Sequence, residues 1–255
     1  MLLEGKRALV TGAGGRLGRR IVELFTAEGA SVAALDVDAH RLARVEGASC
    51  ALVADVADEA RIGEVVADAD RRLGGMDVLV NAHGYVPNRP VLDVRADEWD
   101  RTFAVNVRGV MLACQAAGRL WVERGTRGAM VSLSSGAGTS ARRGGAHYCG
   151  SKAAVDMLVQ VLAIELGEHG IRVNAVAPGL VMDEVVDRPG GHHTYVDMML
   201  AATPLGRTGS PDDIAQAVAF LASDRAAWIT GAVVPVTGGS HCGRPHVPLT
   251  HDLHQ

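Results

Sequence analysis

A tyrosine and a lysine lie four positions apart in the stretch VSLSSGAGTSARRGGAHYCGSK, at residues 131–152. On a helix, the side chains of Tyr148 and Lys152 would share one face. A phenol is a weak base at neutral pH because its ordinary pKa is about 10, but a neighbouring ammonium group stabilises the phenolate and lowers that pKa. The pair therefore predicts proton exchange with an alcohol or a carbonyl group.

Two serines precede this pair, at the end of an apolar run that predicts a buried strand. The run covers 130–133, and Ser134 and Ser135 follow it, ahead of a glycine-rich loop. A serine hydroxyl at this strand end could hold the same substrate oxygen that the tyrosine protonates. The residues alone leave open which serine does so, and a tyrosine and a lysine at this spacing are often found together by chance.

The N-terminal region has the order of elements that a dinucleotide phosphate site requires. The apolar run 6–11 leads into TGAGGRLG, at residues 11–18, and the amphipathic segment 19–28 follows. Glycines let the backbone approach a pyrophosphate, and a helix N-terminus presents free N–H groups to it. A strand before this turn and a helix after it are the context that this mechanism needs.

Acidic residues follow the second and third predicted strands. The strand 31–35 ends at Asp36, whose carboxylate can accept both hydroxyl hydrogen bonds of an adenosine ribose and would repel a 2′-phosphate, so NAD is favoured over NADP. The alternative for Asp36 is to cap a helix that starts near Asp38. Asp55 follows the strand 50–54 and could contact the adenine or cap the next helix.

The rest of the chain continues this alternation of strands and helices. It predicts an α/β fold: a single Rossmann-like, doubly wound parallel sheet of about seven strands, flanked by helices on both faces. We expect one domain over 1–240, with an irregular substrate lid at 180–204, and a tail at 241–255 that could wrap a neighbouring subunit. The further predicted strands are 76–81, 172–177 and 231–236, and the predicted helices are 59–73, 98–124, 148–167 and 211–222, the last with Ser210 as N-cap.

The composition argues against several classes of protein. The chain has 25 basic and 29 acidic residues, a net charge of -4 and no block of basic residues, so we expect no nucleic-acid partner. No apolar run reaches the ~20 residues needed to cross a bilayer, so we expect no membrane partner and a cytoplasmic location. The four cysteines are scattered without a C-x-x-C pair, and the histidines lack ligand spacing, so we expect no metal site.

The helix predicted at 148–167 indicates self-association. Its stretch VDMLVQVLAIEL is apolar on nearly every side. A helix without a wide polar face is buried on more than one side. We therefore expect a subunit interface on this helix and a homo-oligomer, most simply a tetramer.

Together these motifs resemble those of the short-chain dehydrogenase/reductase family, in the subgroup of about this length. The resemblance runs from Lys6 to about Gly239. It implies an NAD(P)-dependent alcohol dehydrogenase or ketoreductase that transfers a hydride between nicotinamide C4 and a secondary alcohol or ketone. The motifs appear in the family's order: TGAGGRLG, NAHG at 81–84, NVRG at 106–109, Ser135, Tyr148-x-x-x-Lys152 and Pro178-Gly179.

The resemblance also implies roles for individual residues. Tyr148 would be the general acid and base, and Lys152 would lower its pKa and hold the nicotinamide ribose. Ser135 rather than Ser134 would hold the substrate oxygen, and Asn106 would bend the long helix and hold a water that links Lys152 to solvent. The residues implied to bind the cofactor are Gly12, Gly15, Arg16, Leu17, Gly18, Asp36, Asp55, Val56, Asn81, Ala82, Gly84, Tyr148, Lys152, Pro178, Gly179 and Val181.

The sequence departs from the family's pattern at four places. Arg16 replaces the middle glycine of T-G-x-x-x-G-x-G, so the turn also resembles that of the longer, nucleotide-sugar-processing members. Arg16 could offer charge to a cofactor phosphate, which keeps NADP as an alternative. Asp183 replaces the threonine that meets the nicotinamide carboxamide, and V-T-G-G at 236–239 replaces V-D-G-G. NAHG replaces N-N-A-G, and its His83 could titrate near neutral pH or simply pack.

Arginines in the predicted pocket walls suggest a polar or anionic substrate. Arg89, Arg142 and Arg143 fall in these segments, and His147 lies beside the catalytic tyrosine. An inward arginine could pair with a carboxylate, phosphate or sulfonate group. The alternative is that these loop arginines are solvated.

Two functions from other classes compete with a dehydrogenase. A dinucleotide-binding regulator would need the glycine turn, but it would have no use for Ser135, Tyr148 and Lys152 together. A dehydratase or epimerase would use hydride transfer only transiently, and the glycine spacing suggests it faintly. Net reduction of the cofactor would separate both from a dehydrogenase.

Overall fold

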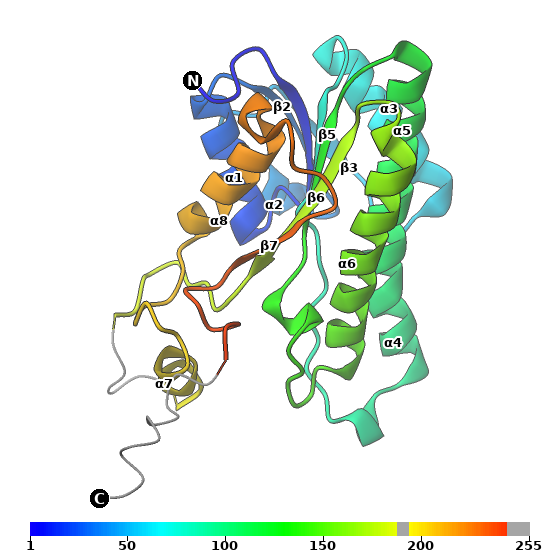
Figure 1. Cartoon of the computed structure of the whole chain (residues 1–255). Helices are drawn as coiled ribbons and strands as arrows, with labels where there is room; N and C mark the ends of the chain where they lie inside the picture. The colour runs from blue at the N-terminus through cyan, green and yellow to red at the C-terminus, as the bar shows by residue number, and fades with distance from the viewer. Residues whose placement is uncertain (188–193, 244–255) are drawn as a thin grey trace, which may run out of the picture.

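A seven-stranded parallel sheet forms the centre of the computed structural model, which describes residues 1–187 and 194–243 (Figure 1). The strand order is β3-β2-β1-β4-β5-β6-β7, so the chain winds outward in both directions from the middle of the sheet. This confirms the predicted fold class. The strands are β1 (Arg7–Thr11), β2 (Ser31–Asp36), β3 (Cys50–Val53), β4 (Val78–Asn81), β5 (Ala129–Leu133), β6 (Arg172–Pro178) and β7 (Val233–Val236).

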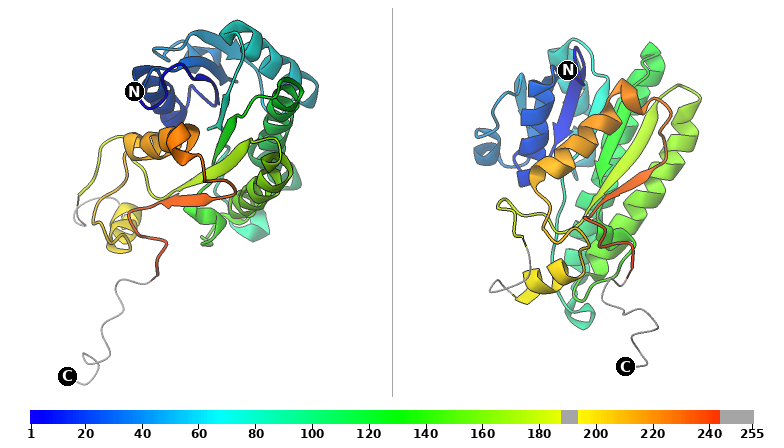
Figure 2. Two further views of the ribbon diagram at one scale, coloured as in Figure 1. Left: turned by 45° about the horizontal axis from the view of Figure 1, so that its top comes forward. Right: turned by 60° about the vertical axis from the view of Figure 1, so that its left-hand side comes forward.

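Helices cover both faces of the sheet (Figure 2). On one face, α1 (Arg16–Ala27) and α8 (Pro211–Ala222) pack on alternate residues of the strands, such as Val10 and Val80. On the other face, α3 (Glu59–Leu73), α5 (Gly109–Arg124) and α6 (Ala146–Gly167) pack on the residues between them. Side chains alternate between the faces of a strand, so the central strands are apolar throughout and both cores form. No helix in the described ranges is long and apolar enough to span a membrane.

The predicted long helix 98–124 is interrupted. The chain forms α4 (Ala96–Phe103), a π-helical turn at Ala104–Arg108 and then α5. The π turn contains Asn106, which the resemblance places in the active site. An extra residue in a helical turn is typically found at functional sites, because it moves one side chain out of the regular helical register.

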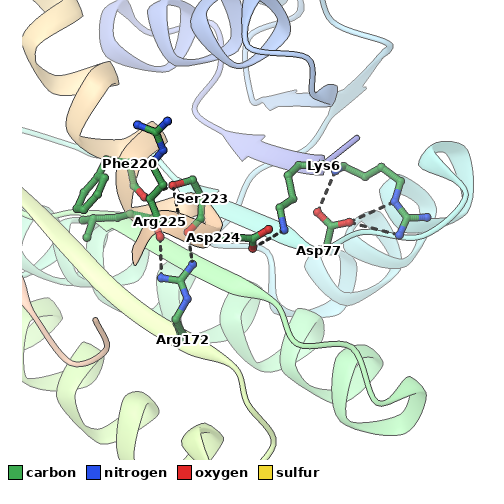
Figure 3. Close-up of polar contacts among 9 residues, drawn as sticks. Lys6, Asp77, Arg172, Phe220, Ser223, Asp224 and Arg225 are labelled. Atoms are coloured by element: carbon green, nitrogen blue, oxygen red, sulfur yellow. Dashed lines mark hydrogen bonds and ion pairs between the residues drawn. The ribbon is translucent and has the colours of Figure 1, made fainter. Parts of the chain in front are cut away.

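Polar contacts at the amino ends of the strands join distant parts of the chain (Figure 3). The guanidinium of Arg172 donates hydrogen bonds to Leu221 O at 2.8 Å and to Ser223 O at 3.0 Å, and so caps the C-terminus of α8. Lys6 pairs with Asp224 at 2.8 Å. The other end of α8 has the predicted N-cap, because Ser210 and Asp213 form a capping box. The contacts of Arg172 and Lys6 fix the amino ends of the strands, opposite the site.

The predicted lid is more regular than we expected. It contains α7 (Thr194–Ala201), which lies beyond the carboxyl ends of the strands (Figure 1), and Val181 forms a β-bridge with Gly209. The stretch 194–201 contains methionines, leucine and alanine, which are good helix formers, and this accounts for the helix. His192 and His193, and most of the predicted tail, lie outside the described residues.

Candidate active site

The structure brings Ser135, Tyr148 and Lys152 together at the carboxyl end of the sheet. Ser135 follows β5 and caps a short 3-10 turn, where its hydroxyl accepts a hydrogen bond from Ala137 N at 3.1 Å. Tyr148 and Lys152 lie in the first two turns of α6, and the Ser135 hydroxyl lies close enough to Tyr148 to act on the pKa of its phenol. Ser134 is buried behind this site. A phenol, a serine hydroxyl and an ammonium group therefore converge on one place.

The electrostatics at Tyr148 differ from the prediction. Burial raises the pKa of its phenol above the ordinary value, although the Ser135 hydroxyl and the charge of Arg142 act in the opposite direction. The Arg142 guanidinium lies 5.2 Å from the ring centroid. We predicted that Lys152 would lower this pKa, but its Nζ is 5.9 Å from the ring centroid and donates a hydrogen bond to Leu133 O at 2.6 Å. In the protein alone, Arg142 is the cation that acts on Tyr148.

Lys152 is itself almost completely buried, with 3% of its surface exposed. Burial disfavours the charged form and lowers the pKa of its amine to about 8, while the charge of Asp156 acts to raise it. Its Nζ points toward Gly84, where a Cβ atom would lie 4.0 Å from Nζ and 3.7 Å from Asn106 Oδ1. The ammonium therefore borders the loop after β4.

Asn106 joins three segments around the site. Its Nδ2 donates to Tyr85 O and to Ser151 Oγ, both at 2.9 Å, and its Oδ1 accepts from Tyr85 N at 2.7 Å. The π turn is thus clamped to the loop after β4 and to α6. The water-holding role implied for Asn106 stays a prediction.

The glycine turn between β1 and α1 has the shape of a phosphate cradle. Gly12 has a φ of +66°, and a Cβ atom on Gly18 would lie 2.1 Å from Gly12 O, so neither position accepts a side chain. Gly15 caps α1 without a side-chain hydrogen bond, which leaves the first N–H groups of the helix available. The cavity beside the turn is lined by many of the residues predicted to bind the cofactor: Gly12, Gly15, Asp36, Asp55, Val56, Ala82 and Gly84.

The two acidic residues of this cavity do not cap helices. Asp38 caps α2 (Ala39–Leu42) and Asp58 caps α3, so the alternative accounts of Asp36 and Asp55 are wrong. Asp36 accepts hydrogen bonds from Gly14 N at 2.9 Å and from Asp38 N at 3.0 Å.

Asp55 forms an ion pair with Arg101 at 3.0 Å. Burial raises the pKa of Asp55, but hydrogen bonds from Ala57 N and Arg101 outweigh burial, and the pKa lies below its ordinary value. Asp55 is therefore a carboxylate at neutral pH. The sequence analysis missed Arg101, which also lines the cavity; no local motif marks it, because α4 brings it there.

Several of the other predicted cofactor residues point away from the cavity. The side chains of Leu17 and Val181 pack in the core between the sheet and α1, so any contact they make with a cofactor would use the backbone. Asn81 is buried, and its Nδ2 donates to Cys114 Sγ at 3.3 Å and to Ser132 Oγ at 3.2 Å. Pro178 ends β6, and a Cβ atom on the next residue, Gly179, would lie 2.9 Å from Thr237 Cα.

Two departures from the family's pattern form a pair. Arg16 Nε lies 3.6 Å from the carboxylate of Asp183, which follows β6 at the start of the predicted lid. Both side chains are exposed. Their pairing was not foreseen, because the two positions are far apart in the chain and each has an ordinary residue type.

A third departure, His83, is a buried neutral residue. Its Nδ1 lies 2.6 Å from the hydroxyl of Thr11, at the end of β1. Burial, helped by the charge of Lys152, lowers its pKa to about 3. These observations favour the packing alternative, because burial keeps the imidazole neutral at neutral pH.

The residues predicted to contact the substrate divide into two groups. Arg142 is exposed and lies over the Tyr148 ring, and Arg143 is exposed nearby. His147, in contrast, is fully buried, and its Nε2 lies 3.2 Å from Glu98, which also pairs with Arg89 at 2.7 Å. The structure contradicts the prediction of a substrate contact for His147, because α6 turns its ring toward α4.

Comparison with known proteins identifies the family to which the chain belongs. A family model described as enoyl-(acyl carrier protein) reductase matches residues 12–241. The chain is 38% identical to D-threitol dehydrogenase of Mycolicibacterium smegmatis over 93% of both chains. It is 40% identical to L-rhamnose 1-dehydrogenase (NAD(P)(+)) of a Sphingomonas species over 94% of this chain and 98% of that one. A crystal structure of a short-chain type dehydrogenase/reductase from Mycobacterium marinum has a TM-score of 0.86 and 32% identity, and covers 94% of this chain and 97% of that chain.

The chain therefore belongs to the short-chain dehydrogenase/reductase family. The class of activity predicted from the sequence is confirmed: it is an NAD(P)-dependent oxidoreductase that acts on alcohol or carbonyl groups.

Proposed function

We propose that this protein oxidises a secondary alcohol of a polyol or sugar to a ketone, with NAD as the hydride acceptor. The observation that carries the proposal is the convergence of Ser135, Tyr148 and Lys152 beside the glycine-turn cavity. The substrate class is supported by relatives named for such substrates, among them a galactitol 2-dehydrogenase (L-tagatose-forming) of Cereibacter sphaeroides, 40% identical over 93% of this chain and 95% of that one.

The chain's residues divide the chemistry between them. The Ser135 hydroxyl holds the substrate oxygen. The phenolate of Tyr148 takes the proton of the substrate hydroxyl as the hydride leaves the carbon that bears this hydroxyl. The ammonium group of Lys152, 5.9 Å from the ring centroid of Tyr148, would stabilise the phenolate. Nicotinamide C4 accepts the hydride when the cofactor is bound.

The residues around the glycine turn fit a dinucleotide. Gly12 and Gly18 leave the space for a pyrophosphate, and the N-terminus of α1 offers its N–H groups. Asp36 would accept hydrogen bonds from the adenosine ribose in place of the backbone bonds it accepts in the protein alone, and a 2′-phosphate would meet its negative charge. NAD is therefore the proposed cofactor rather than NADP.

Arg142 favours a second substrate class, a hydroxy compound with an anionic group. Its guanidinium is exposed and lies 5.2 Å from the centroid of the Tyr148 ring, where it could pair with a carboxylate or phosphate of the substrate. Neutral polyols and matching hydroxy acids should therefore be compared in the same assay.

We also propose that the protein is a homotetramer. The outer face of α6 exposes Met157, Val161 and Ile164, and the groove between α5 and α6 is lined by apolar residues such as Val122 and Leu158. A second exposed apolar surface lies across the molecule at α8 and the loop before β7, with Phe220 and Trp228, the latter fully exposed. Two separate surfaces that each meet their own copy about a two-fold axis would produce a closed tetramer.

A cytoplasmic location is part of the same proposal. The four cysteines, all among the described residues, are free thiols, and none is placed to form a disulfide with another. Free thiols persist in a reducing compartment. Fractionation of cells that express the protein would test this.

The function is tested by cofactor binding and turnover with purified protein. NAD and NADP are titrated separately by calorimetry, and neutral polyols and hydroxy acids are then screened at alkaline pH for absorbance of the reduced nicotinamide. We expect preferential NAD binding and turnover that Tyr148→Phe abolishes. Binding without net reduction would favour the regulator or a transient-hydride enzyme, and no binding of either cofactor would overturn the proposal.

A further inference from the structure

A buried carboxylate lies beside the catalytic site and takes no part in the chemistry proposed above. Asp156 has 9% of its surface exposed, and its Oδ1 is buried without a hydrogen-bond partner among the described residues. It follows Lys152 by four positions on α6, so both side chains point to the same face of the helix. A buried carboxylate without full compensation costs free energy, which makes a functional reason for it worth seeking.

Asp156 continues a ladder of contacts between α6 and the end of β5. On successive turns of α6, Tyr148 meets the Ser135 hydroxyl, Lys152 donates to Leu133 O at 2.6 Å, and Asp156 faces Ser134. Burial raises the pKa of Asp156, while Ser134 and the charge of Lys152 act to lower it. The carboxylate also packs against the 3-10 turn that Ser135 caps, where a Cβ atom on Gly138 would lie 2.6 Å from Oδ2.

The other groups that face Lys152 do not balance its charge. From the loop after β4 comes His83, which is neutral above a pKa of about 3. The π turn contributes the neutral amide of Asn106, and β5 contributes a carbonyl oxygen. On α6 itself, the phenol of Tyr148 is neutral in the protein alone, because its pKa is raised. Nearby on α4, Glu98 pairs with Arg89 and His147 rather than with Lys152.

We propose that Asp156 is a positioning residue that acts as the buried counter-charge of Lys152 and keeps that side chain in its ammonium form during turnover. The two groups are too far apart for an ion pair, so the effect is exerted through the low-dielectric interior rather than through a direct contact. Without Asp156, the buried amine would lose its proton at a lower pH, and the phenolate of Tyr148 would lose its stabilising cation. The effect of Asp156 on catalysis rests on the proposed function. The effect of Asp156 on the protonation of Lys152 does not depend on it.

The chain offers a direct test of the electrostatic part, because it contains only two lysines, Lys6 and Lys152. Protein labelled with 13C-lysine should show two sets of side-chain signals, assigned with the variant Lys6→Arg and titrated without any substrate. In the unaltered protein the Lys152 signal should titrate near pH 8, and in Asp156→Asn its midpoint should fall by ~1 pH unit or more. Lys6, which pairs with Asp224 at the amino end of the sheet, is the internal reference.

A matched control uses Glu168→Gln, which removes one carboxylate from the exposed end of the same helix. Its Lys152 midpoint should equal that of the unaltered protein. An unchanged Lys152 midpoint in Asp156→Asn would overturn the proposal, whether or not the substrate has been found. If Asp156→Asn does not fold, Asp156→Glu keeps the charge and should keep the midpoint, and a midpoint in this variant that falls by a full unit would also contradict the proposal.

The catalytic consequence has its own signature. The kcat/KM of Asp156→Asn should be roughly tenfold below that of the unaltered protein at pH 9, and the difference should vanish toward pH 6, where Lys152 is protonated in both proteins. A merely structural role would lower kcat/KM equally at every pH, and that result would overturn the catalytic part. If the unaltered protein reduces no cofactor with any alcohol, the proposed function fails, and the lysine titration still decides the role of Asp156.

Discussion

The two faces of α6 contrast sharply. Tyr148, Lys152 and Asp156 form one stripe, and the last two are buried. Met157, Val161 and Ile164 form another stripe on the opposite side of the helix, at about 100° per residue, and Ile164 is 80% exposed. Like a helix on an ordinary soluble protein, α6 buries apolar residues against the sheet, namely Val155, Val159 and Ala163. It departs from that pattern by also having a buried charged stripe on one side and an exposed apolar stripe on the other.

These two departures indicate which residues of α6 are present for function. Burying a lysine and an aspartate without an ion pair lowers stability, and exposing isoleucine and methionine gives no stability to a single subunit. Both departures make sense if the polar stripe performs the chemistry and the apolar stripe meets another copy of the chain. Neither stripe is explained by the folding of one subunit alone.

The largest expected effect comes from removing the charge on the polar stripe. In Lys152→Met, kcat should fall by roughly 10²- to 10⁴-fold, because the phenolate of Tyr148 loses its stabilising cation. The free energy of unfolding should not fall in proportion, because the folded state no longer has to bury an ammonium group. Steady-state kinetics and urea unfolding on the same preparation measure both quantities. A variant that lost stability but kept kcat would show that this stripe is structural.

The apolar stripe should respond in the opposite way. Ile164→Asp places a carboxylate in the proposed interface of every subunit, and like charges across an interface cost several kcal/mol. We expect the mass in solution to fall by at least half while the fold is kept, as measured by light scattering and circular dichroism. Leu92→Asp, at an exposed leucine outside both proposed interface surfaces, is the control and should keep the mass. An unchanged mass in Ile164→Asp would remove this stripe from the interface.

Much of this architecture could be predicted from the sequence. The bounds of α3 and α8 match the prediction at both ends, because acidic or serine caps and a clear apolar periodicity mark them. The seven strands were found because buried parallel strands are short apolar runs bounded by glycine and polar residues. The glycine turn, Ser135, Tyr148 and Lys152 were found because their chemistry depends on local spacing.

The rest depends on contacts between distant segments. The π turn around Asn106 leaves no mark in the periodicity of 98–124, since the extra residue is accommodated by bonds to Tyr85 and Ser151. That α6 carries two opposed stripes was also missed, because its sequence looks apolar on nearly every side. The pairing of Arg16 with Asp183 and the position of Arg142 over Tyr148 depend on loops, whose paths local sequence does not determine.

A smaller effect concerns His83, whose pKa is lowered by burial and by the charge of Lys152 on the polar stripe. The pKa of His83 in the folded protein is about 3, below its ordinary value of about 6.5, so the unfolded chain binds a proton that the folded protein does not. The stabilising effect of the neutral histidine is therefore complete above about pH 6.5 and is lost as the pH falls toward 3. Between pH 7 and pH 5, the free energy of unfolding should therefore fall by about 2 kcal/mol less in His83→Ala than in the unaltered protein.

Urea unfolding of both proteins at the two pH values measures this difference directly. Carboxylates that titrate in the same range contribute equally to both proteins, so they cancel in the comparison. An equal loss of stability in the two proteins would mean that His83 is protonated in the folded state, and that the cavity around it admits water.

The smallest effect should come from Arg142, which is exposed and whose charge is partly screened by solvent. It lowers the pKa of Tyr148, so Arg142→Gln should raise that pKa, leave less phenolate at a given pH and reduce kcat/KM on a neutral polyol about two- to fivefold. The reduction should be similar from pH 6 to pH 8 and should shrink in 1 M salt, because salt screens an exposed cation but not the buried Lys152. Arg61→Gln, at an exposed arginine on α3, is the control. A loss confined to anionic substrates would instead make Arg142 a substrate-binding residue, and the chemistry would then depend on the buried stripe of α6 alone.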